Sequence, residues 1–242
     1  MAEHMPLLRT NSLTMRFGGV TAVRDVNFSI GAVELRCVIG PNGAGKSTFF
    51  KLLTGQLKPT SGTIEFRGER IGGHISHEIA RLGIGIKTQV PNVFNGLPVR
   101  ENIWLAARCR HTSRETRRLV DEILEKIRMT KHADDLVGQL SHGQRQWVEI
   151  GTVLAGEPEL ILLDEPAAGM TDDDAVRTAE IIREINKTRS LIVVEHDMEF
   201  IKMIARKVTV FHRGEILMED AVDKVLRDQR VRDVYLGKKV AA

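Results

Sequence analysis

The segment that most limits what this chain can fold into is residues 40–47, GPNGAGKS. It matches G-x-x-x-x-G-K-[ST], a loop whose glycines let backbone N–H groups point at phosphate oxygens. The apolar stretch 33–39 before it is typical of a strand, and residues 46–54 after it are typical of a helix. The sequence therefore predicts a nucleotide-binding α/β core, with Lys46 on the β- and γ-phosphates and Ser47 on Mg²⁺. The alternative, a purely structural glycine turn, is disfavoured because a chance match to this pattern is rare in a chain of this length.

A pair of acids follows the apolar run 160–163, LILL. Ligands of α/β proteins bind at the carboxyl ends of such buried strands. Asp164 is therefore predicted to hold Mg²⁺, and Glu165 to polarise the attacking water. Taken alone, the pattern fits a solvated strand end equally well, and the phosphate loop upstream favours the functional interpretation.

Three other polar features are ambiguous by themselves. Gln89 follows a predicted strand at 84–87, where a glutamine is usually an ordinary loop residue. His196 follows the apolar run 191–194, where a histidine is more often packed or capping than catalytic. Ser141, in the segment LSHGQ (140–144), is a predicted helix N-cap whose exposed N–H groups form a second anion-binding site.

Hydrophobic periodicity predicts alternating strands and helices with a helical insertion. Residues 1–90 and 156–242 are expected to form the two parts of the nucleotide-binding core, and residues 91–155 a helical subdomain. The predicted strands are 23–30, 33–39, 63–66, 84–87, 160–163, 191–194, 208–211 and 215–218. The predicted helices are 46–54, 75–82, 99–109, 114–129, 141–155 and 173–187, with short helices near residue 236.

Composition narrows the classes of protein further. The 242 residues carry a net charge of +3 with acids and bases interspersed, which does not favour a nucleic-acid-binding surface. Cys37 and Cys109 have no metal-like spacing, and buried reduced thiols in a cytoplasmic protein are expected. Neither an 18-residue apolar run nor a signal peptide is found. Any work at a membrane is therefore expected from its inner face, through partner proteins.

In their order along the chain, the phosphate loop, Gln89, LSHGQ, LILLDEP and His196 resemble the nucleotide-binding subunit of ABC transporters. The resemblance covers nearly the whole chain. It implies a P-loop NTPase cassette with a RecA-like parallel sheet, an antiparallel β subdomain and an inserted helical subdomain. It also implies ATP and Mg²⁺ as ligands, and a head-to-tail dimer with a second ATPase subunit, identical or different.

The resemblance assigns roles that spacing alone does not. Phe17 would stack on adenine, Gln89 would contact Mg²⁺ and sense the membrane partner, and His196 would contact the γ-phosphate. The signature turn, residues 140–144, would bind the γ-phosphate held by the other subunit, and the loop 168–172 would pass between the two sites. The predicted catalytic residues are Lys46, Glu165 and His196; the predicted nucleotide-binding residues are Phe17, Gly40, Pro41, Asn42, Gly43, Ala44, Gly45, Lys46, Ser47, Thr48, Gln89, Ser141, His142, Gly143, Gln144 and Asp164; and the predicted Mg²⁺ ligands are Ser47, Gln89 and Asp164.

The sequence departs from the usual L-S-G-G-Q signature at His142, which replaces the first glycine. We expect its imidazole to point to solvent, although it could instead donate to a phosphate or to the facing adenosine. Thr88 departs from the usual aromatic residue before the glutamine, which puts the details of coupling to the membrane subunit in doubt.

Within the family, residues 16–23 and 77–84 resemble importers of branched-chain amino acids. Residues 140–151, LSHGQRQWVEIG, are closer to the urea-type members of that group. Uptake of urea or short amides is therefore the first expectation, and uptake of branched-chain amino acids the alternative. Transmembrane permease subunits and a solute-binding protein are implied as partners. A soluble ABC ATPase acting on nucleic acid or ribosomes is a distant alternative, because such proteins carry two cassettes or long coiled-coil inserts.

Overall fold

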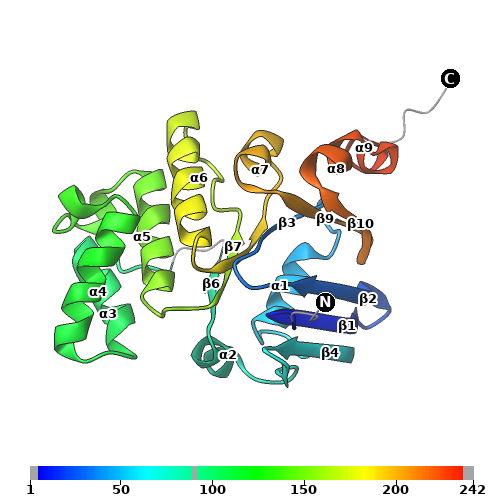
Figure 1. Ribbon diagram of the computed structural model, residues 1–242, viewed down its shortest axis with the longest axis horizontal. Coiled ribbons are helices and arrows are strands. Elements are labelled where there is room, and N and C mark those ends of the chain that lie inside the picture. Colours follow the sequence, from blue (N-terminus) through cyan, green and yellow to red (C-terminus); the bar gives the residue numbers. More distant parts are fainter. Residues whose placement is uncertain (1–4, 89–91, 237–242) are drawn as a thin grey trace.

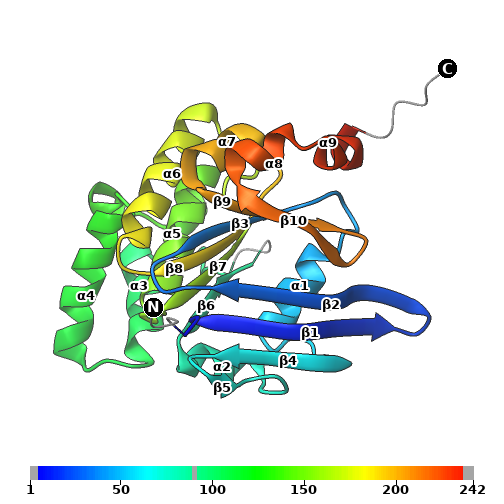
Figure 2. The ribbon, with the colours of Figure 1, turned by 45° about the vertical axis from the view of Figure 1, so that its right-hand side comes forward.

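The strands of the chain form two sheets in a computed structural model that describes residues 5–88 and 92–236. One sheet has the order β10-β9-β3-β8-β7-β6 and the other has the order β2-β1-β4-β5. The strands from β9 to β6 run parallel, whereas β10 and the four-stranded sheet are antiparallel. Figure 2 shows the antiparallel sheet lying beneath the parallel one. The strands are β1 Leu8–Phe17, β2 Val20–Ile30, β3 Leu35–Ile39, β4 Ser61–Phe66, β5 Glu69–Arg70, β6 Ile84–Lys87, β7 Leu160–Asp164, β8 Ser190–Val194, β9 Lys207–His212 and β10 Glu215–Ala221.

Figure 1 shows α8 and α9 at one end of the molecule, beside β9 and β10, and another group of helices at the opposite end. Helices α3, α4 and α5 pack on one another at that end, and α6 and α7 lie between them and β9. The helices are α1 Lys46–Leu53, α2 Ser76–Leu82, α3 Val99–Arg108, α4 Ser113–Lys126, α5 His142–Leu154, α6 Asp172–Asn186, α7 Met198–Ile204, α8 Val222–Arg227 and α9 Gln229–Leu236, with 3₁₀ turns at Thr130–His132 and Val137–Gln139.

The parallel strands are buried on both faces, which explains their unbroken apolar sequences. Along β3, Cys37 and Ile39 belong to the core shared with the helices, whereas Val38 faces the core shared with the antiparallel sheet. The strand β7 alternates in the same way, with Ile161 on the first side and Leu162 on the second. A one-residue slip would exchange the side chains that face these two cores, so packing in both cores specifies the register that places polar residues at the strand ends.

Helix α1 is fixed in the core between the sheets by its aromatic residue Phe49, which is fully buried. The Phe49 ring centroid lies 5.4 Å from that of Phe28 in an edge-on arrangement and 5.2 Å from that of Phe211. Such pairs contribute about 0.5–1.5 kcal/mol beyond their burial. They place the start of α1, and so the phosphate loop, at a defined position.

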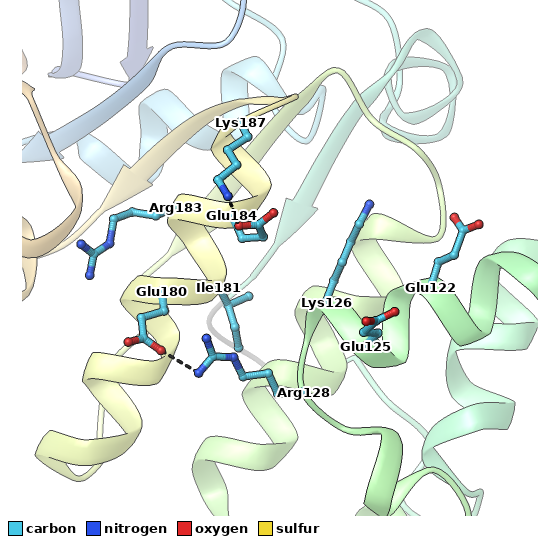
Figure 3. A pocket seen from close by; sticks show the side chains of 9 residues that line it. All are labelled: Glu122, Glu125, Lys126, Arg128, Glu180, Ile181, Arg183, Glu184 and Lys187. Atoms are coloured by element: carbon cyan, nitrogen blue, oxygen red, sulfur yellow. Dashed lines mark hydrogen bonds and ion pairs between the residues drawn. The ribbon is translucent and has the colours of Figure 1, made fainter.

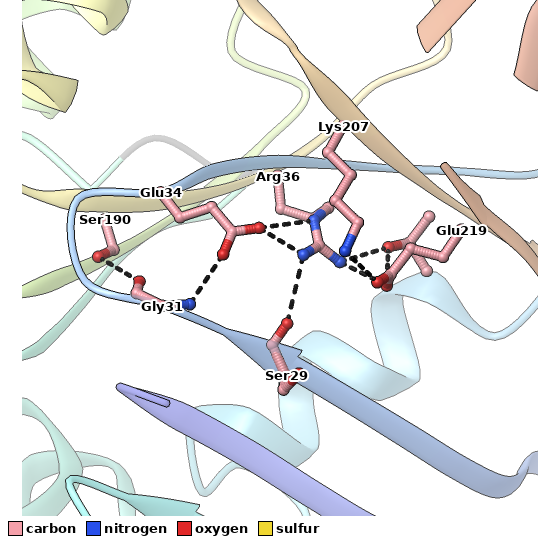
Figure 4. A network of polar contacts seen from close by, with 8 residues as sticks. Ser29, Gly31, Glu34, Arg36, Ser190, Lys207 and Glu219 are labelled. Carbon is pink, nitrogen blue, oxygen red and sulfur yellow. Dashed lines mark hydrogen bonds and ion pairs between the residues drawn. The ribbon is translucent and has the colours of Figure 1, made fainter. Parts of the chain in front are cut away.

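A buried arginine joins the two sheets (Figure 4). The Arg36 guanidinium, whose side chain is 2% exposed, pairs with the carboxylates of Glu34 and Glu219. It also donates to Thr209 Oγ1 at 3.1 Å and to the Ser29 carbonyl oxygen at 3.4 Å. A buried charge is tolerated only when its donors are satisfied in this way, so the network fixes β2 against β3, β9 and β10.

Most of the expected elements are present, and several features differ. Strand β1, the two-residue strand β5 and helix α7 were not expected, and α4 ends at Lys126 instead of Met129. The expectation of two buried thiols is correct for Cys37 and wrong for Cys109, which is exposed just after α3. Within the described residues, no helix combines the length and apolar character needed to cross a membrane.

Candidate functional site

The phosphate loop, residues 40–45, connects the end of β3 to the start of α1. Gly45 is the N-cap of α1 with φ 103°, and a Cβ there would lie 2.4 Å from the Ala22 carbonyl oxygen. Only glycine fits this position. Because Gly45 offers no side-chain cap, the first N–H groups of α1 are directed at the loop and available to an anion. The Lys46 ammonium lies within the same loop and donates to the carbonyl oxygens of Gly40 at 2.6 Å and Pro41 at 3.0 Å.

The predicted acids lie beside this lysine, at the end of β7. Burial raises the pKa of Asp164, and the neighbouring charge of Glu165 raises it further. Burial lowers the pKa of Lys46, while the charges of Glu165 and Asp164 act in the opposite direction. The charges of Lys46, Asp164 and Glu165 thus influence one another, because the phosphate loop after β3 and the acids at the end of β7 lie at the same edge of the parallel sheet.

Glu165 is held in a strained backbone conformation with φ 47°. Non-glycine residues rarely adopt this left-handed region, which costs about 1–3 kcal/mol and persists only where surrounding contacts enforce it. Its N–H donates to the Val194 carbonyl oxygen at 2.9 Å, and its own carbonyl oxygen accepts from the Ala168 N–H at 3.3 Å. The turn aims the Glu165 side chain toward His196, whose Nδ1 is 3.5 Å from Glu165 Oε1.

Glu195 is a functional candidate that sequence reasoning missed. Its side chain is 1% exposed, and burial raises its pKa. One carboxylate oxygen accepts from the Ala167 N–H and the other from the His196 N–H, both at 3.1 Å. Glu195 therefore fastens the loop after Glu165 to the loop that carries His196. The only sequence signal is an acid directly after a buried strand.

The signature turn forms a complete capping box at the start of α5. Ser141 Oγ accepts from the Gln144 N–H at 3.2 Å, and Gln144 Oε1 accepts from the Ser141 N–H at 3.0 Å. The predicted N-cap is therefore confirmed. A Cβ at Gly143 would lie 2.7 Å from Asp174 Oδ2, in the first turn of α6, so glycine lets the two helices approach closely.

The expectation that the His142 imidazole points only to solvent is wrong. The residue is exposed, but its Nε2 lies 3.0 Å from the carbonyl oxygen of Ala168 and 3.3 Å from Gln146 Nε2. The signature turn is thereby joined to the loop that follows Glu165 in the same chain. Nothing local in the sequence predicts this, because Ala168 lies 26 residues away.

A buried ion pair lies near the signature helix. Lys87 Nζ, at the end of β6, is 3.6 Å from Glu149 Oε2 on α5, with side-chain exposures of 1% and 5%. Burial lowers the pKa of Lys87 and raises the pKa of Glu149, and the attraction between the two opposes both shifts. The pair links the strand that precedes Gln89 to the signature helix, and sequence reasoning missed it. Gln89 itself lies outside the described residues.

The structure separates the two halves of the predicted nucleotide site. Figures 1 and 2 place α5, with the signature turn, on one side of β6 and β7, and α1 with the phosphate loop on the other side. Phe17 lies at the end of β1 and is 47% exposed, which leaves it accessible to a base. One chain thus presents a phosphate loop with its acids, and separately a second anion-binding turn.

Of the grooves outside this site in the described part of the chain, two lie beside helices. One, of about 740 Å³, lies between α2, β6 and α3 and is lined by Ile79, Phe94, Leu105 and Cys109 among others. The other, of about 720 Å³, lies between α4 and α6 (Figure 3). It contains four acids and four bases, including an Arg128–Glu180 pair at 2.6 Å, and this balance is typical of solvated helix faces.

The donors near the phosphate loop fit a magnesium ion better than a transition metal. Ser47 and Asp164 offer hard oxygen ligands, which Mg²⁺ prefers together with nucleotide phosphates. The burial that raises the pKa of Asp164 gives a carboxylate that a cation would stabilise. Among the described residues, no group of three His, Cys, Asp or Glu side chains is arranged to hold a metal ion without a nucleotide.

Comparisons with known proteins agree with this geometry. The family model described as ABC transporter matches residues 23–168. The chain is 33% identical to the high-affinity branched-chain amino acid transport ATP-binding protein LivG of Escherichia coli strain K12, and 34% identical to the corresponding protein BraF of Pseudomonas aeruginosa. Each alignment covers 96% of this chain and 98% of the relative.

A solved structure supports the fold along the whole chain. The crystal structure of the ADP conformation of an ATP-binding cassette from an ABC transporter superposes with a TM-score of 0.87 at 28% identity. The superposition covers 97% of this chain and 100% of that one. The expected cassette fold is confirmed.

Proposed function

Because the chain belongs to the ABC transporter family, as an ATP-binding and ATP-hydrolysing subunit, we propose that it powers solute uptake with Glu165 at the chemical step. The observation that carries this proposal is the arrangement of four groups. Lys46 lies inside the phosphate loop, Asp164 and Glu165 lie beside it, and His196 Nδ1 is 3.5 Å from Glu165 Oε1.

In the proposed mechanism, the loop N–H groups and Lys46 bind the β- and γ-phosphates. Glu165 orients the attacking water, and His196 contacts the γ-phosphate from the neighbouring strand end. The His196 side chain is 61% exposed and Glu165 is 26% exposed, so both are within reach of a ligand. Lys46 stabilises the charge that develops on the transferring phosphoryl group.

Mg²⁺ would be held by Ser47 and Asp164, with Gln89 as a further ligand, and would neutralise part of the phosphate charge. For Asp164 the ion also offsets the burial that raises its pKa. The adenine would stack on the exposed ring of Phe17.

The site is proposed to be complete only in a head-to-tail dimer. The signature turn, with Ser141 and Gly143, lies across the parallel sheet from the phosphate loop of its own chain (Figure 1). In a dimer it would face the γ-phosphate bound by the partner. ATP then favours the closed dimer through contacts that ADP cannot make, which is the differential affinity that any ligand-driven closure requires. The partner is a second copy or a different ATPase subunit.

The proposed solute is a branched-chain amino acid. Two relatives named for branched-chain amino acid transport align over 96% of the chain, which supports this alternative better than the first expectation of urea. Urea or a short amide remains the second candidate, favoured by the segment LSHGQRQWVEIG at 140–151. The chain itself is not expected to touch the solute, which a solute-binding protein would deliver to the permease.

Permease subunits are proposed to dock in the groove between α2 and α3. Its floor is partly apolar and its rim exposes Phe94 and Leu105, the pattern of a protein-binding surface. The chain would thus bind peripherally at the inner face of the membrane. The helical segment 91–155 would carry dimer closure to the permease, because it supplies both the groove wall and the signature turn.

The chemistry is tested by steady-state ATP hydrolysis of Glu165→Gln, with Glu159→Gln as the matched surface control. Glu159 is 44% exposed and pairs only with the exposed Arg67 among the described residues. We expect at least a 100-fold lower kcat for Glu165→Gln, because an amide cannot orient water as a carboxylate does, and no change for the control. Hydrolysis by Glu165→Gln at the wild-type rate would remove Glu165 from the mechanism.

The solute is tested in vesicles that contain the chain with its co-purified permease subunits and solute-binding protein. ATP-dependent uptake of radiolabelled leucine without uptake of urea supports the branched-chain proposal. Uptake of urea alone supports the second candidate, and uptake of neither contradicts both.

A further inference from the structure

We propose that His142 is a positioning residue that ties the signature turn to Glu165 of its own chain. This inference rests on the proposed function, because it links the two ATP sites of a dimer. The signature turn would face the ATP of the partner, whereas Glu165 serves the ATP bound by the same chain. A contact between them means that a movement of the signature turn at one ATP site changes the position of Glu165 at the other ATP site.

The direct observation is the 3.0 Å contact from His142 Nε2 to the carbonyl oxygen of Ala168. A carbonyl oxygen only accepts, so Nε2 carries the proton, and the imidazole donates. The Gln146 amide touches the same nitrogen at 3.3 Å, and its own oxygen is buried without a partner among the described residues. Turning that amide over would let its oxygen share the Nε2–H with Ala168 in a three-centre hydrogen bond, by which Gln146 would help to orient the ring.

Ala168 is the last residue of the turn that positions Glu165. The Ala168 N–H donates to the Glu165 carbonyl oxygen at 3.3 Å, and the preceding residue, Ala167, donates to Glu195 at 3.1 Å. The turn is therefore held at one end by the core sheet and at the other by His142 from α5. Glu165 is kept at φ 47° by the contacts around it. Loss of the contact between His142 and Ala168 would therefore let the backbone relax and turn the Glu165 side chain away from the attacking water.

The other contacts of α5 make His142 part of a rigid frame. Trp147 Nε1 donates to Thr178 Oγ1 at 2.8 Å, and Gly143 lies directly against Asp174, both on α6. A displacement of the signature turn, such as release of a phosphate would cause, therefore moves Ala168 as well. A glycine at position 142 would keep the capping box but lose this contact.

The first experiment compares His142→Leu and His142→Gln, with His74→Leu as a matched histidine control on the exposed loop before α2. Leucine removes the donor, and we expect kcat to fall about 3- to 10-fold with KM for ATP within twofold. Glutamine places an amide N–H near the position of Nε2 and should restore most of kcat. His74→Leu should match the wild type.

The second experiment assigns the effect to one chain. Mixed dimers, purified through two different tags, carry one Glu165→Gln chain and one chain with intact Glu165, and single-turnover hydrolysis is measured. Placing His142→Leu in the chain with intact Glu165 should slow hydrolysis. Placing it in the Glu165→Gln chain, whose signature faces the hydrolysed ATP, should not.

The outcomes separate this inference from the proposed function. A His142→Leu dimer with wild-type kcat, or slowing only when His142→Leu faces the ATP across the interface, would overturn the positioning role and leave the function standing. Absence of ATP hydrolysis by the wild-type chain with its partners would contradict the proposed function itself.

Discussion

Replacing Lys87 by methionine leaves the carboxylate of Glu149 inside the protein without its cation, and we expect this to destabilise the chain strongly. The two side chains are 1% and 5% exposed, and Lys87 Nζ lies 3.6 Å from Glu149 Oε2. Methionine keeps most of the volume of the lysine side chain. The loss in the free energy of unfolding is therefore due to the missing charge and not to a new cavity.

The magnitude is bounded by the protonation of Glu149. Glu149 can avoid carrying a buried unpaired charge by taking up a proton. For a carboxyl with an ordinary pKa of 4.5, this protonation costs about 4 kcal/mol at about pH 7.5, at 1.36 kcal/mol per pH unit. Breaking a buried pair typically costs about 3–5 kcal/mol. We therefore expect the free energy of unfolding to fall by about 3–4 kcal/mol.

The sign of the pH dependence follows from the same step. In Lys87→Met, the folded state raises the pKa of Glu149, so stability is greatest at low pH and is lost as the pH rises through that pKa. The difference from wild type should shrink to about 1–2 kcal/mol near pH 5.5. In Glu149→Gln the buried Lys87 has a lowered pKa, and that variant should instead approach the wild type as the pH rises.

Urea denaturation of both variants and of the double variant Lys87→Met/Glu149→Gln, followed by circular dichroism, tests the reasoning. The double variant should be more stable than either single one, because no unpaired charge remains. A loss below about 1 kcal/mol in Lys87→Met, or a double variant that shows the sum of the two losses, would refute it.

Three further predictions follow from other contacts. Burial raises the pKa of Asp164 above its ordinary value of 3.8, so the folded state loses stability as the pH rises through the raised pKa. Asp164→Asn removes this charge and should therefore raise the melting temperature near neutral pH, while it abolishes ATP hydrolysis. An unchanged or lower melting temperature would contradict this. Arg36→Met should cost about 2–3 kcal/mol in urea denaturation, because the partly buried Glu34 loses its cation and Glu219 keeps only Lys207 as a cation among the described residues. Arg24→Met, with an ion pair that is about half exposed, should stay within about 0.5 kcal/mol, and equal losses would argue against the network. Cys109 should react with a maleimide in the isolated chain while Cys37 does not, and assembly with the permease subunits should protect Cys109; labelling that assembly leaves unchanged would argue against docking in that groove.

The elements that the sequence predicted best are those whose pattern has one physical meaning. The short unbroken apolar runs of β7 and β8 are typical of strands buried on both faces, and the glycine-lysine loop needs a strand before it and a helix after it. Strand β1 was missed because its pairing with β2 shifts register at several points, so its side chains do not alternate cleanly. Helix α7 has only seven residues and therefore a weak periodic signal, and it lacks the glycine C-cap that Gly83 gives to α2, a helix of the same length that was predicted.

The residues that sequence reasoning missed act across long separations. Glu195 binds the loop at Ala167, 28 residues away, and Lys87 pairs with Glu149 on a helix of a different segment. Local patterns carry no signal for such contacts. The same reason explains the wrong expectation for His142, whose partner is fixed by the packing of α5 on α6.

The proposed mechanism requires an ATP site that is shared between two chains, and ATP hydrolysis per subunit measured against protein concentration tests this requirement. The wild-type rate should rise with concentration, or on addition of the partner ATPase and permease subunits. Ser141→Arg should keep the rate low at every concentration while the phosphate loop still binds ATP. A rate per subunit that is independent of concentration and unaffected by Ser141→Arg would mean that one chain holds the complete site, and would contradict the account.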